Sequence, residues 1–261
     1  MADPSTSTYS AEFYEDQSLG SRRSADIVLP IVKAIVEPAS VVDVGCGVGT
    51  WLAGWRALGV ADVLGLDGSW VDSAMLQIPP ACFRPYDLTR PIHLERSFDL
   101  AMSLEVAEHL EARHADDFVA SLVGLAPVVL FSAAIPGQGG RHHVNEQWPD
   151  YWCDRFARHG YQPVDCVRRR VWTAPIDYCY AQNTFLYAAS RALETNAALR
   201  AERQSNAGAP LSLVHPEHYR AVTKPLGKPG RLFGLLLASL GPALRRRAAR
   251  GFRDGEPTIG R

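Results

Sequence analysis

Apolar positions along the chain alternate between short β-branched runs and stretches with helical spacing. The first helical stretch, 25–36, repeats apolar residues every three or four positions, and this spacing predicts an amphipathic helix. Pro30 lies inside the stretch and predicts a kink, because proline lacks the backbone N–H that a helix needs. Pro38 marks the predicted end of the helix.

The apolar runs that follow predict a series of strands. In chain order they are Val41–Val44, Val63–Asp67, Cys82–Tyr86, Phe98–Leu104, Val128–Ala133, Val164–Arg169 and Thr184–Ala189. Helical stretches are predicted between them at Trp51–Leu58, from Val106 onward, at Asp116–Leu125 and at Pro149–His159. Strands that alternate with helices are typical of α/β proteins, in which helices cover both faces of a parallel sheet.

The distribution of charge divides the chain into regions. The 261 residues carry 27 Lys and Arg against 28 Asp and Glu, but residues 191–261 alone hold 13 basic and 5 acidic side chains. The alternating pattern also fades from about Arg191 into Ala, Gly, Pro and Arg. We therefore expect an N-terminal cap segment at 1–24, an α/β domain at 25–190 and a basic C-terminal extension at 191–261.

Composition narrows the classes of function. Hydrophobic residues make up 47% of the chain, enough for a real core, and the net charge of −1 argues against a specific nucleic-acid partner. The five cysteines are odd in number and contain no C-x-x-C pair, which favours a reducing cytoplasm over a disulfide framework. The polar N-terminus lacks the pattern of a signal peptide.

The C-terminal extension contains an apolar stretch, Leu232–Leu244, that is followed by clustered arginines up to Arg250. The stretch is too short for a membrane span, which needs about 20 residues. An apolar segment beside arginines is typical of helices that lie on anionic membranes, so peripheral membrane contact is one expectation. A tail that is disordered or docked on a partner is the other.

The sharpest chemical signal is the segment 41–50, in which a strand leads into glycines at 45, 47 and 49. Glycine allows a tight turn and lets the backbone approach a ligand closely. The spacing is G-x-G-x-G after an aspartate, which differs from the G-x-G-x-x-G of dinucleotide sites. Asp67 ends the second strand, where a carboxylate can accept ribose hydroxyls, and Asp87 follows the third, where it can meet an adenine amino group. The alternative is a tight turn beside two solvated carboxylates.

These features resemble the class I S-adenosylmethionine-dependent methyltransferases. The resemblance covers roughly residues 25–189, in the segments VDVGCGVGT, VLGLDGS, FRPYDL, FDLAMSLEVAEHL and VVLFSAAIPGQGG. It implies a Rossmann-like sheet of seven mostly parallel strands with an antiparallel hairpin at its end, and a glycine loop that cradles the methionine part of S-adenosylmethionine. The implied cofactor-binding residues are Asp43, Gly45, Cys46, Gly47, Gly49, Asp67, Gly68, Asp87, Leu88 and Glu105.

A second motif, EVAEH at 105–109, follows the fourth predicted strand. A helix that begins near Glu105 would place its two glutamates and its histidine on one face. A glycine-rich loop after the fifth strand carries two more histidines and would lie beside this face. Carboxylates and imidazoles gathered in this way suit a divalent cation. The predicted metal ligands are Glu105, Glu108, His109, His142 and His143.

The motif resembles the EVxEH segment of ubiquinone-pathway O-methyltransferases and of small-RNA ribose methyltransferases, which hold magnesium there. The resemblance implies Mg²⁺ or Mn²⁺, which can bind two neighbouring hydroxyls and lower the pKa of one of them. Many methyltransferases carry E-x-x-E-H without a metal. In that case Glu105 orients the cofactor or the substrate, and one of the loop histidines is the general base. The predicted catalytic residues are His142, His143 and Glu108.

The sequence therefore predicts an enzyme that transfers a methyl group to a hydroxyl of a small molecule, such as a vicinal diol of a sugar or glycoside. One alternative is a metal-free C- or N-methyltransferase of natural-product biosynthesis. Another is an RNA ribose methyltransferase, which the acidic balance of residues 1–190 disfavours. A module that binds the cofactor without catalysis is the remaining class, and the intact glycine loop with Asp67 argues against it.

Overall fold

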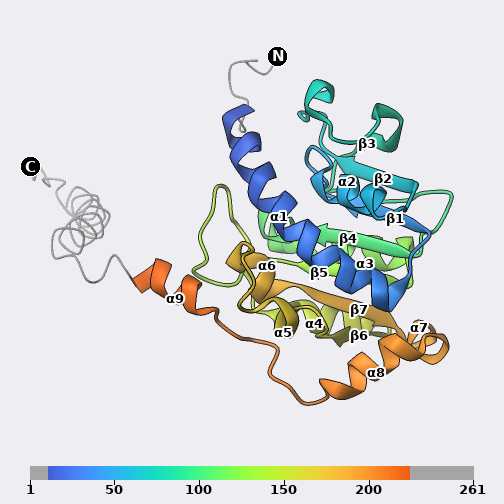
Figure 1. Cartoon of the computed structure of the whole chain (residues 1–261), viewed down its shortest axis with the longest axis vertical. Coiled ribbons are helices and arrows are strands. Elements are labelled where there is room, and N and C mark those ends of the chain that lie inside the picture. Colours follow the sequence, from blue (N-terminus) through green and yellow to red (C-terminus); the bar gives the residue numbers. More distant parts are fainter. Residues whose placement is uncertain (1–10, 224–261) are drawn as a thin grey trace, which may run out of the picture. The chain divides into compact units, whose positions relative to one another are not determined.

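The structure is a computed structural model that describes residues 11–223, with side chains from Gly20 onward (Figure 1). The first ten residues of the predicted cap segment and the apolar and basic stretch at 232–250 lie outside the described residues. The chain divides into two compact units, Met1–His215 and Pro216–Arg261. The described part of the second unit is one helix, α9 (Pro216–Thr223).

Within residues 11–223, seven strands form one sheet in the order β3-β2-β1-β4-β5-β7-β6. Neighbouring strands from β3 to β5 are parallel, whereas β7 is antiparallel to both β5 and β6. The strands are β1 (Ser40–Val44), β2 (Asp62–Asp67), β3 (Phe83–Pro85), β4 (Leu100–Leu104), β5 (Val128–Ser132), β6 (Tyr161–Val164) and β7 (Phe185–Ala189). This arrangement confirms the expected mostly parallel sheet with an antiparallel hairpin at one end.

Helices cover both faces of this sheet, as expected for an α/β fold (Figure 1). In the first unit they are α1 (Ala11–Val36), α2 (Thr50–Ala57), α3 (Ala115–Leu125), α4 (Pro149–Arg158), α5 (Arg168–Val171), α6 (Tyr178–Asn183), α7 (Ser190–Thr195) and α8 (Ala197–Ser205). Short 3₁₀ turns lie at η1 (Ser73–Met75), η2 (Pro80–Cys82), η3 (Ala107–His109) and η4 (Ala112–His114). Among the described residues, none of the helices combines the length and the apolar character that a membrane crossing requires.

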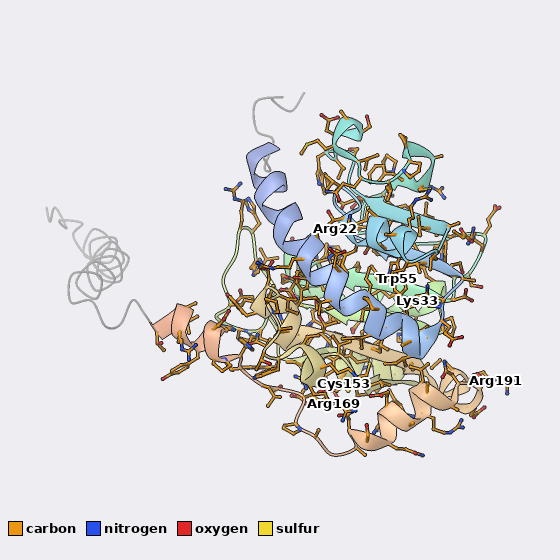
Figure 2. The ribbon with its side chains drawn as sticks, in the orientation of Figure 1. Arg22, Lys33, Trp55, Cys153, Arg169 and Arg191 are labelled. Atoms are coloured by element: carbon orange, nitrogen blue, oxygen red, sulfur yellow. The ribbon has the colours of Figure 1, made fainter. Side chains whose placement is uncertain are left out.

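Successive residues of each buried strand pack against opposite layers, because side chains alternate across a strand. Val41 of β1 packs into the cluster that contains α1 and α2, and Val42 into the cluster that contains α3 and α4. Trp55 of α2 is completely buried and donates its indole N–H to the sulfur of Met102 at 2.9 Å (Figure 2). The two layers fix the strand ends at which the candidate site lies.

Several element boundaries differ from the prediction. Helix α1 begins at Ala11 rather than Ala25 and continues through Pro30. The strand expected at Val164–Arg169 ends at Val164 instead, and the chain then turns into α5. In this turn the buried guanidinium of Arg168 pairs with Asp165 at 2.6 Å and lies over the ring of Phe185 in β7, so the charge is compensated inside the fold.

The first compact unit extends to His215, past the boundary expected at 190. Leu193 of α7 and Leu199 of α8 are buried in the same cluster as α1. Asn196 between the two helices donates its side-chain amide to the carbonyl of Ile35 at 2.9 Å. The basic charge of this segment hid its apolar face, because two buried leucines in a polar stretch give no clear helical period.

Candidate functional site

The glycine loop after β1 has the conformation that its sequence requires. Gly45, Gly47 and Gly49 have φ values of 85°, 53° and 83°, in the left-handed region that favours glycine. A Cβ added at Gly45 would lie 2.4 Å from a methyl carbon of Val106, so any side chain there would clash. A Cβ at Gly47 would meet no described atom within 4 Å, so the middle of the loop presents its backbone to open space.

Asp67 at the end of β2 lies against this loop. Its carboxylate accepts hydrogen bonds from the amides of Gly47 at 2.7 Å and Gly68 at 2.6 Å. Burial raises the pKa of Asp67, and these two amides oppose the rise. Asp43 of β1 lies deeper, and burial followed by the charge of Asp67 raises its pKa to about 8. The structure therefore brings together the glycine loop and the two acidic residues nearest to it.

The remaining residues predicted for the cofactor lie at the edges of this region. Cys46 is buried, and its sulfur lies so close to Gly65 that a Cβ added there would be only 2.6 Å away. Asp87 is exposed, and its carboxylate accepts hydrogen bonds from the amide and hydroxyl of Thr89 at 3.0 and 2.6 Å. Leu88 packs partly buried against the core. The Asp87 carboxylate caps its own turn, so the geometry gives it a structural role beside the one predicted.

Glu105 does not begin a helix. Its φ of 55° places it in the left-handed region, and the only regular turn of the motif is η3, which starts at Ala107. The Glu105 carboxylate accepts hydrogen bonds from Gln138 at 2.7 Å and from Asn183 at 3.1 Å. Burial raises the pKa of Glu105 despite these amide donors. The three side chains of the motif therefore do not share one helix face, and Glu105 belongs to a separate amide-lined cluster.

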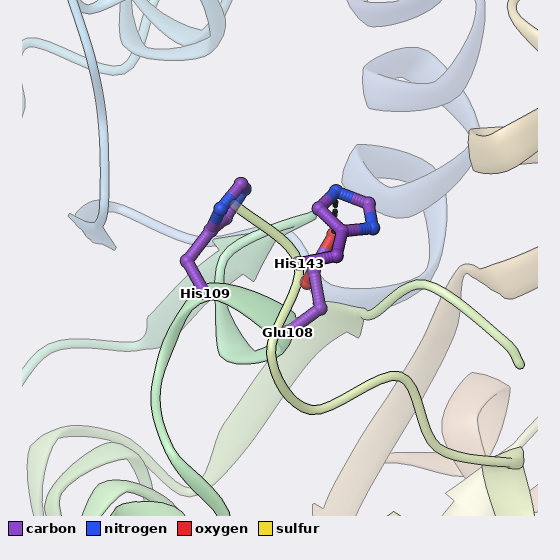
Figure 3. Close-up of side chains that lie close together, drawn as sticks. All are labelled: Glu108, His109 and His143. Carbon is purple, nitrogen blue, oxygen red and sulfur yellow. Dashed lines mark ion pairs between the residues drawn. The ribbon is translucent and has the colours of Figure 1, made fainter. Parts of the chain in front are cut away.

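Glu108, His109 and His143 converge instead, and Figure 3 shows the three side chains at the strand ends. One potential ligand atom from each lies within 4.8 Å of the others. The Nε2 atom of His143 is 3.9 Å from Oε1 of Glu108, and the two imidazole rings meet edge to face with centroids 4.9 Å apart. His142 lies outside this group, exposed and with a φ of 61°.

The buried acidic side chain of this group, Glu108, has no lysine or arginine partner and no hydrogen-bond donor to compensate its charge among the described residues. Glu108 is fully buried, and neither carboxylate oxygen has a hydrogen-bond partner among the described residues. Burial, and next the charge of Glu105, raise the pKa of Glu108 well above its ordinary range. Burial, and next the charge of His143, lower the pKa of His109 to about 4. A neutral His109 keeps a lone pair, and a cation beside Glu108 would compensate the buried carboxylate.

Backbone hydrogen bonds hold the histidine loop against the motif. The amides of Val144 and Asn145 donate to the carbonyl of Glu108 at 2.9 and 3.0 Å. Glu146 accepts a hydrogen bond from Nδ1 of His143 at 2.9 Å. Partial burial opposes ionisation of Glu146, but this bond and loop amides hold its pKa below the ordinary value.

Sequence reasoning missed Gln138, Asn183 and Glu146 as parts of the site. Gln138 and Glu146 stand in the glycine-rich loop, where their polarity alone did not distinguish them from solvated residues. Asn183 ends α6 just before the buried strand β7 and is 3% exposed. In the sequence it stands between Gln182 and Thr184, and this polar context gave no sign of its burial. All three contact residues that the motifs had identified.

Comparisons with known proteins place the chain among the methyltransferases. The family profile described as "Methyltransferase domain" matches residues 16–167. A solved sugar N-methyltransferase from Streptoalloteichus is 17% identical with a TM-score of 0.50, and the alignment covers 72% of this chain and 98% of that one. DesVI from Streptomyces venezuelae is 16% identical with a TM-score of 0.49, and the alignment covers 69% and 98%.

An O-methyltransferase family protein from Burkholderia thailandensis is 12% identical with a TM-score of 0.48. The match covers 68% of this chain and only 57% of that protein, so this chain spans little more than half of its length. No curated protein sequence matches the chain significantly. At 17% identity the Streptoalloteichus structure supports the fold alone.

Proposed function

We propose that this chain, which belongs to the class I S-adenosylmethionine-dependent methyltransferases, transfers the methyl group to a hydroxyl of a small molecule such as a vicinal diol. The reaction is an in-line displacement in which the sulfonium–methyl bond breaks and an oxygen–methyl bond forms. S-adenosylhomocysteine leaves, and the hydroxyl proton must be removed. The protein's task is to bind the donor, aim the acceptor and promote the loss of that proton.

The donor site in this proposal is the region between the glycine loop and Asp67. The open backbone at Gly47 leaves room for the methionine part, and the Asp67 carboxylate is at the position where ribose hydroxyls are bound in such folds. Asp67 already gathers two amide donors, so its oxygens are fixed before a ribose arrives. Charge-assisted hydrogen bonds to the ribose would contribute roughly 1.5–3 kcal/mol.

One observation carries the choice of a hydroxyl acceptor: Glu108 is a buried carboxylate whose two oxygens have no hydrogen-bond partner among residues 11–223, beside two imidazoles. Such a carboxylate stays ionised at low cost only beside a cation, because burial alone raises its pKa and favours the protonated form. Mg²⁺ or Mn²⁺ fits this donor set of one carboxylate and two imidazoles, with Mn²⁺ favoured by the nitrogen ligands. Glu108, His109 and His143 would hold the ion.

A bound divalent cation would supply Lewis acidity that lowers the pKa of an acceptor hydroxyl. The chain's own residues contribute the rest. Glu105, the first residue of the motif, is held by Gln138 and Asn183 and would orient an acceptor or the donor. With Nε2 of His143 committed to the ion beside Glu108, the acidified hydroxyl would lose its proton to solvent.

A metal-free reaction is the second candidate, and the pairing of His143 with Glu146 favours it. A carboxylate that accepts from Nδ1 leaves Nε2 as the basic nitrogen, which is the arrangement of a histidine general base. This arrangement would serve a C- or N-methyltransferase equally well. Metal dependence therefore separates the two candidates.

The test uses the full-length protein, isotope-labelled methyl donor and a panel of sugars, glycosides, amines and catechol-like diols. Product mass and carbon NMR identify the atom that gains the methyl group. The hydroxyl proposal expects a methyl ether, activity that disappears with EDTA, and recovery with Mg²⁺ or Mn²⁺. Full activity in EDTA, or methylation on carbon or nitrogen, would overturn it in favour of the second candidate.

A pair of variants provides the control. Glu108→Gln removes the buried charge and should resist rescue by either ion. Glu111→Gln, three positions later, alters an exposed carboxylate that pairs with Arg113 at 2.9 Å and should behave like the wild type. Loss of activity in both variants would point to a general effect on this segment rather than to a ligand.

A further inference from the structure

Glu146 is the common acceptor for three donors of the histidine loop. One carboxylate oxygen accepts from Nδ1 of His143 at 2.9 Å and from the amide of Gly139 at 2.7 Å, and the other from the amide of Gly137 at 2.8 Å. The side chain therefore ties together three points of a ten-residue loop. The function that the sequence motifs suggest leaves this carboxylate without a role.

The same contacts restrict the histidine. An ionised carboxylate can only accept hydrogen bonds, so a neutral His143 must carry its proton on Nδ1 to donate to Glu146. Nε2 is then unprotonated, and this is the nitrogen that lies 3.9 Å from Glu108. Both side chains are largely enclosed, with 12% of His143 and 19% of Glu146 exposed, so water competes weakly for the pair.

The position of the ring is fixed from its other side as well. A Cβ added at Gly140 would lie 2.3 Å from Nε2 of His143, so the ring lies directly against the backbone of its own loop. The edge of the His143 ring also meets the ring of His109. Glu146 thus acts on a ring that has little freedom to rotate away, and it decides which nitrogen faces the motif.

We infer that Glu146 is a positioning residue that holds His143 as the Nδ1–H tautomer, with the Nε2 lone pair directed at Glu108. The inference rests on the proposed role of His143 in methyl transfer, and it applies whether Nε2 binds a cation or accepts a proton. Carboxylates that orient a metal-bound histidine in this way raise its basicity and typically change metal affinity 10–100-fold. Glu146 never needs to touch the substrate.

The test reads the tautomer directly. Full-length protein labelled with ¹⁵N on histidine gives long-range ¹⁵N–¹H spectra at pH 8 without added metal, and His143→Ala assigns the signals. The wild type should show Nδ1 protonated and Nε2 unprotonated. Glu146→Ala should shift His143 toward the Nε2–H form, whereas Glu146→Gln, which still offers an acceptor oxygen, should retain the Nδ1–H form.

Binding of Mn²⁺, measured by electron paramagnetic resonance of the free ion, provides the second readout. Affinity should fall about 10–100-fold in Glu146→Ala and less in Glu146→Gln. Glu202→Gln is the matched control, because this carboxylate pairs with Arg169 and Arg170 elsewhere on the fold and should change neither signal.

The outcomes separate the inference from the function on which it rests. A wild type that binds no Mn²⁺ removes the proposed metal centre, while the tautomer still decides the role of Glu146. A wild-type His143 that is protonated on Nε2 overturns the inference, even if every variant unfolds. So does a folded Glu146→Ala variant that keeps both the wild-type tautomer and the wild-type affinity.

Discussion

The carboxylate of Asp67 and the backbone amide of Gly47 are joined by a hydrogen bond of 2.7 Å between the ends of neighbouring strands. Asp67 ends β2, and Gly47 belongs to the loop that follows β1. The bond holds the most open glycine of the loop beside the acidic residue that we assign to the ribose. It gives the donor site a fixed geometry that depends on one side chain.

Replacement of that side chain should weaken donor binding. Asp67→Ala removes a charge-assisted acceptor, so calorimetry should find affinity for S-adenosylmethionine reduced at least about tenfold. Asp62→Asn, at the opposite end of the same strand, removes an exposed partner of Arg96 and should leave affinity unchanged. Equal affinity in wild type and Asp67→Ala would exclude Asp67 from the donor site.

The two loop histidines should differ sharply in their effect on turnover. His143 lies in the group with Glu108 and His109, whereas His142 is exposed and outside it. His143→Ala removes a ligand of the proposed ion in the first candidate and the general base in the second, so it should reduce kcat by about 10²–10⁴, whereas His142→Ala should remain within about twofold of the wild type. A large loss in His142→Ala alone would reverse the assignment.

The buried Asp43 should make stability depend on pH. Its pKa is about 8 in the folded chain and that of an ordinary aspartate, about 4, in the unfolded chain, so between these values only the folded state holds the proton. The free energy of unfolding should therefore fall as pH rises from 5 to 8, by about 1 kcal/mol per pH unit from this group. Urea titrations at several pH values measure it.

Asp43→Asn removes this titration, so its stability should change less over the same pH range. Asp26→Asn on α1 is the control, because Asp26 is an exposed partner of Arg22 and its replacement should leave the wild-type slope intact. A slope that is the same in Asp43→Asn and in the wild type would show that Asp43 is ionised at neutral pH.

The segment after β7 should contribute to the stability of the domain. Leu199 of α8 is 1% exposed in the core cluster, so Leu199→Ala should lower the free energy of unfolding by about 2–5 kcal/mol. Ala201→Ser, on the exposed side of the same helix, should change it little. A small effect at Leu199 would restore the domain boundary near residue 190.

Local patterns predicted the sheet well for identifiable reasons. The β-branched run at β1 and the glycines that follow it can form little else than a strand and a tight turn, and Asp67 marks the end of the next strand. The alternation of such runs with helical stretches then determined the α/β class. Each of these inferences depends on residues close together in the sequence.

The candidate site was harder to predict, because its contacts join distant segments. The helix expected to begin at Glu105 was inferred from residue spacing alone. Glu105 instead has a left-handed backbone, and its carboxylate accepts hydrogen bonds from Gln138 and Asn183, which lie far away in the sequence. The pairing of Glu146 with His143 is only three residues apart, yet nothing in the spacing shows that both are enclosed. Both features depend on how distant segments pack together, so they could be assigned only from the folded structure.

The backbone at Glu105 has a consequence for attempts to make the protein more heat-resistant. A residue with a Cβ in the left-handed region is destabilised by about 1–2 kcal/mol relative to the ordinary helical conformation, whereas glycine adopts the left-handed region freely. Glu105→Gly would relieve that strain, but it would also take away the acceptor of the Gln138 and Asn183 amides, and leaving a buried donor without an acceptor costs about 1–3 kcal/mol. The two effects oppose each other, so the backbone strain at Glu105 is held in place by the same side chain that would have to be removed to relieve it.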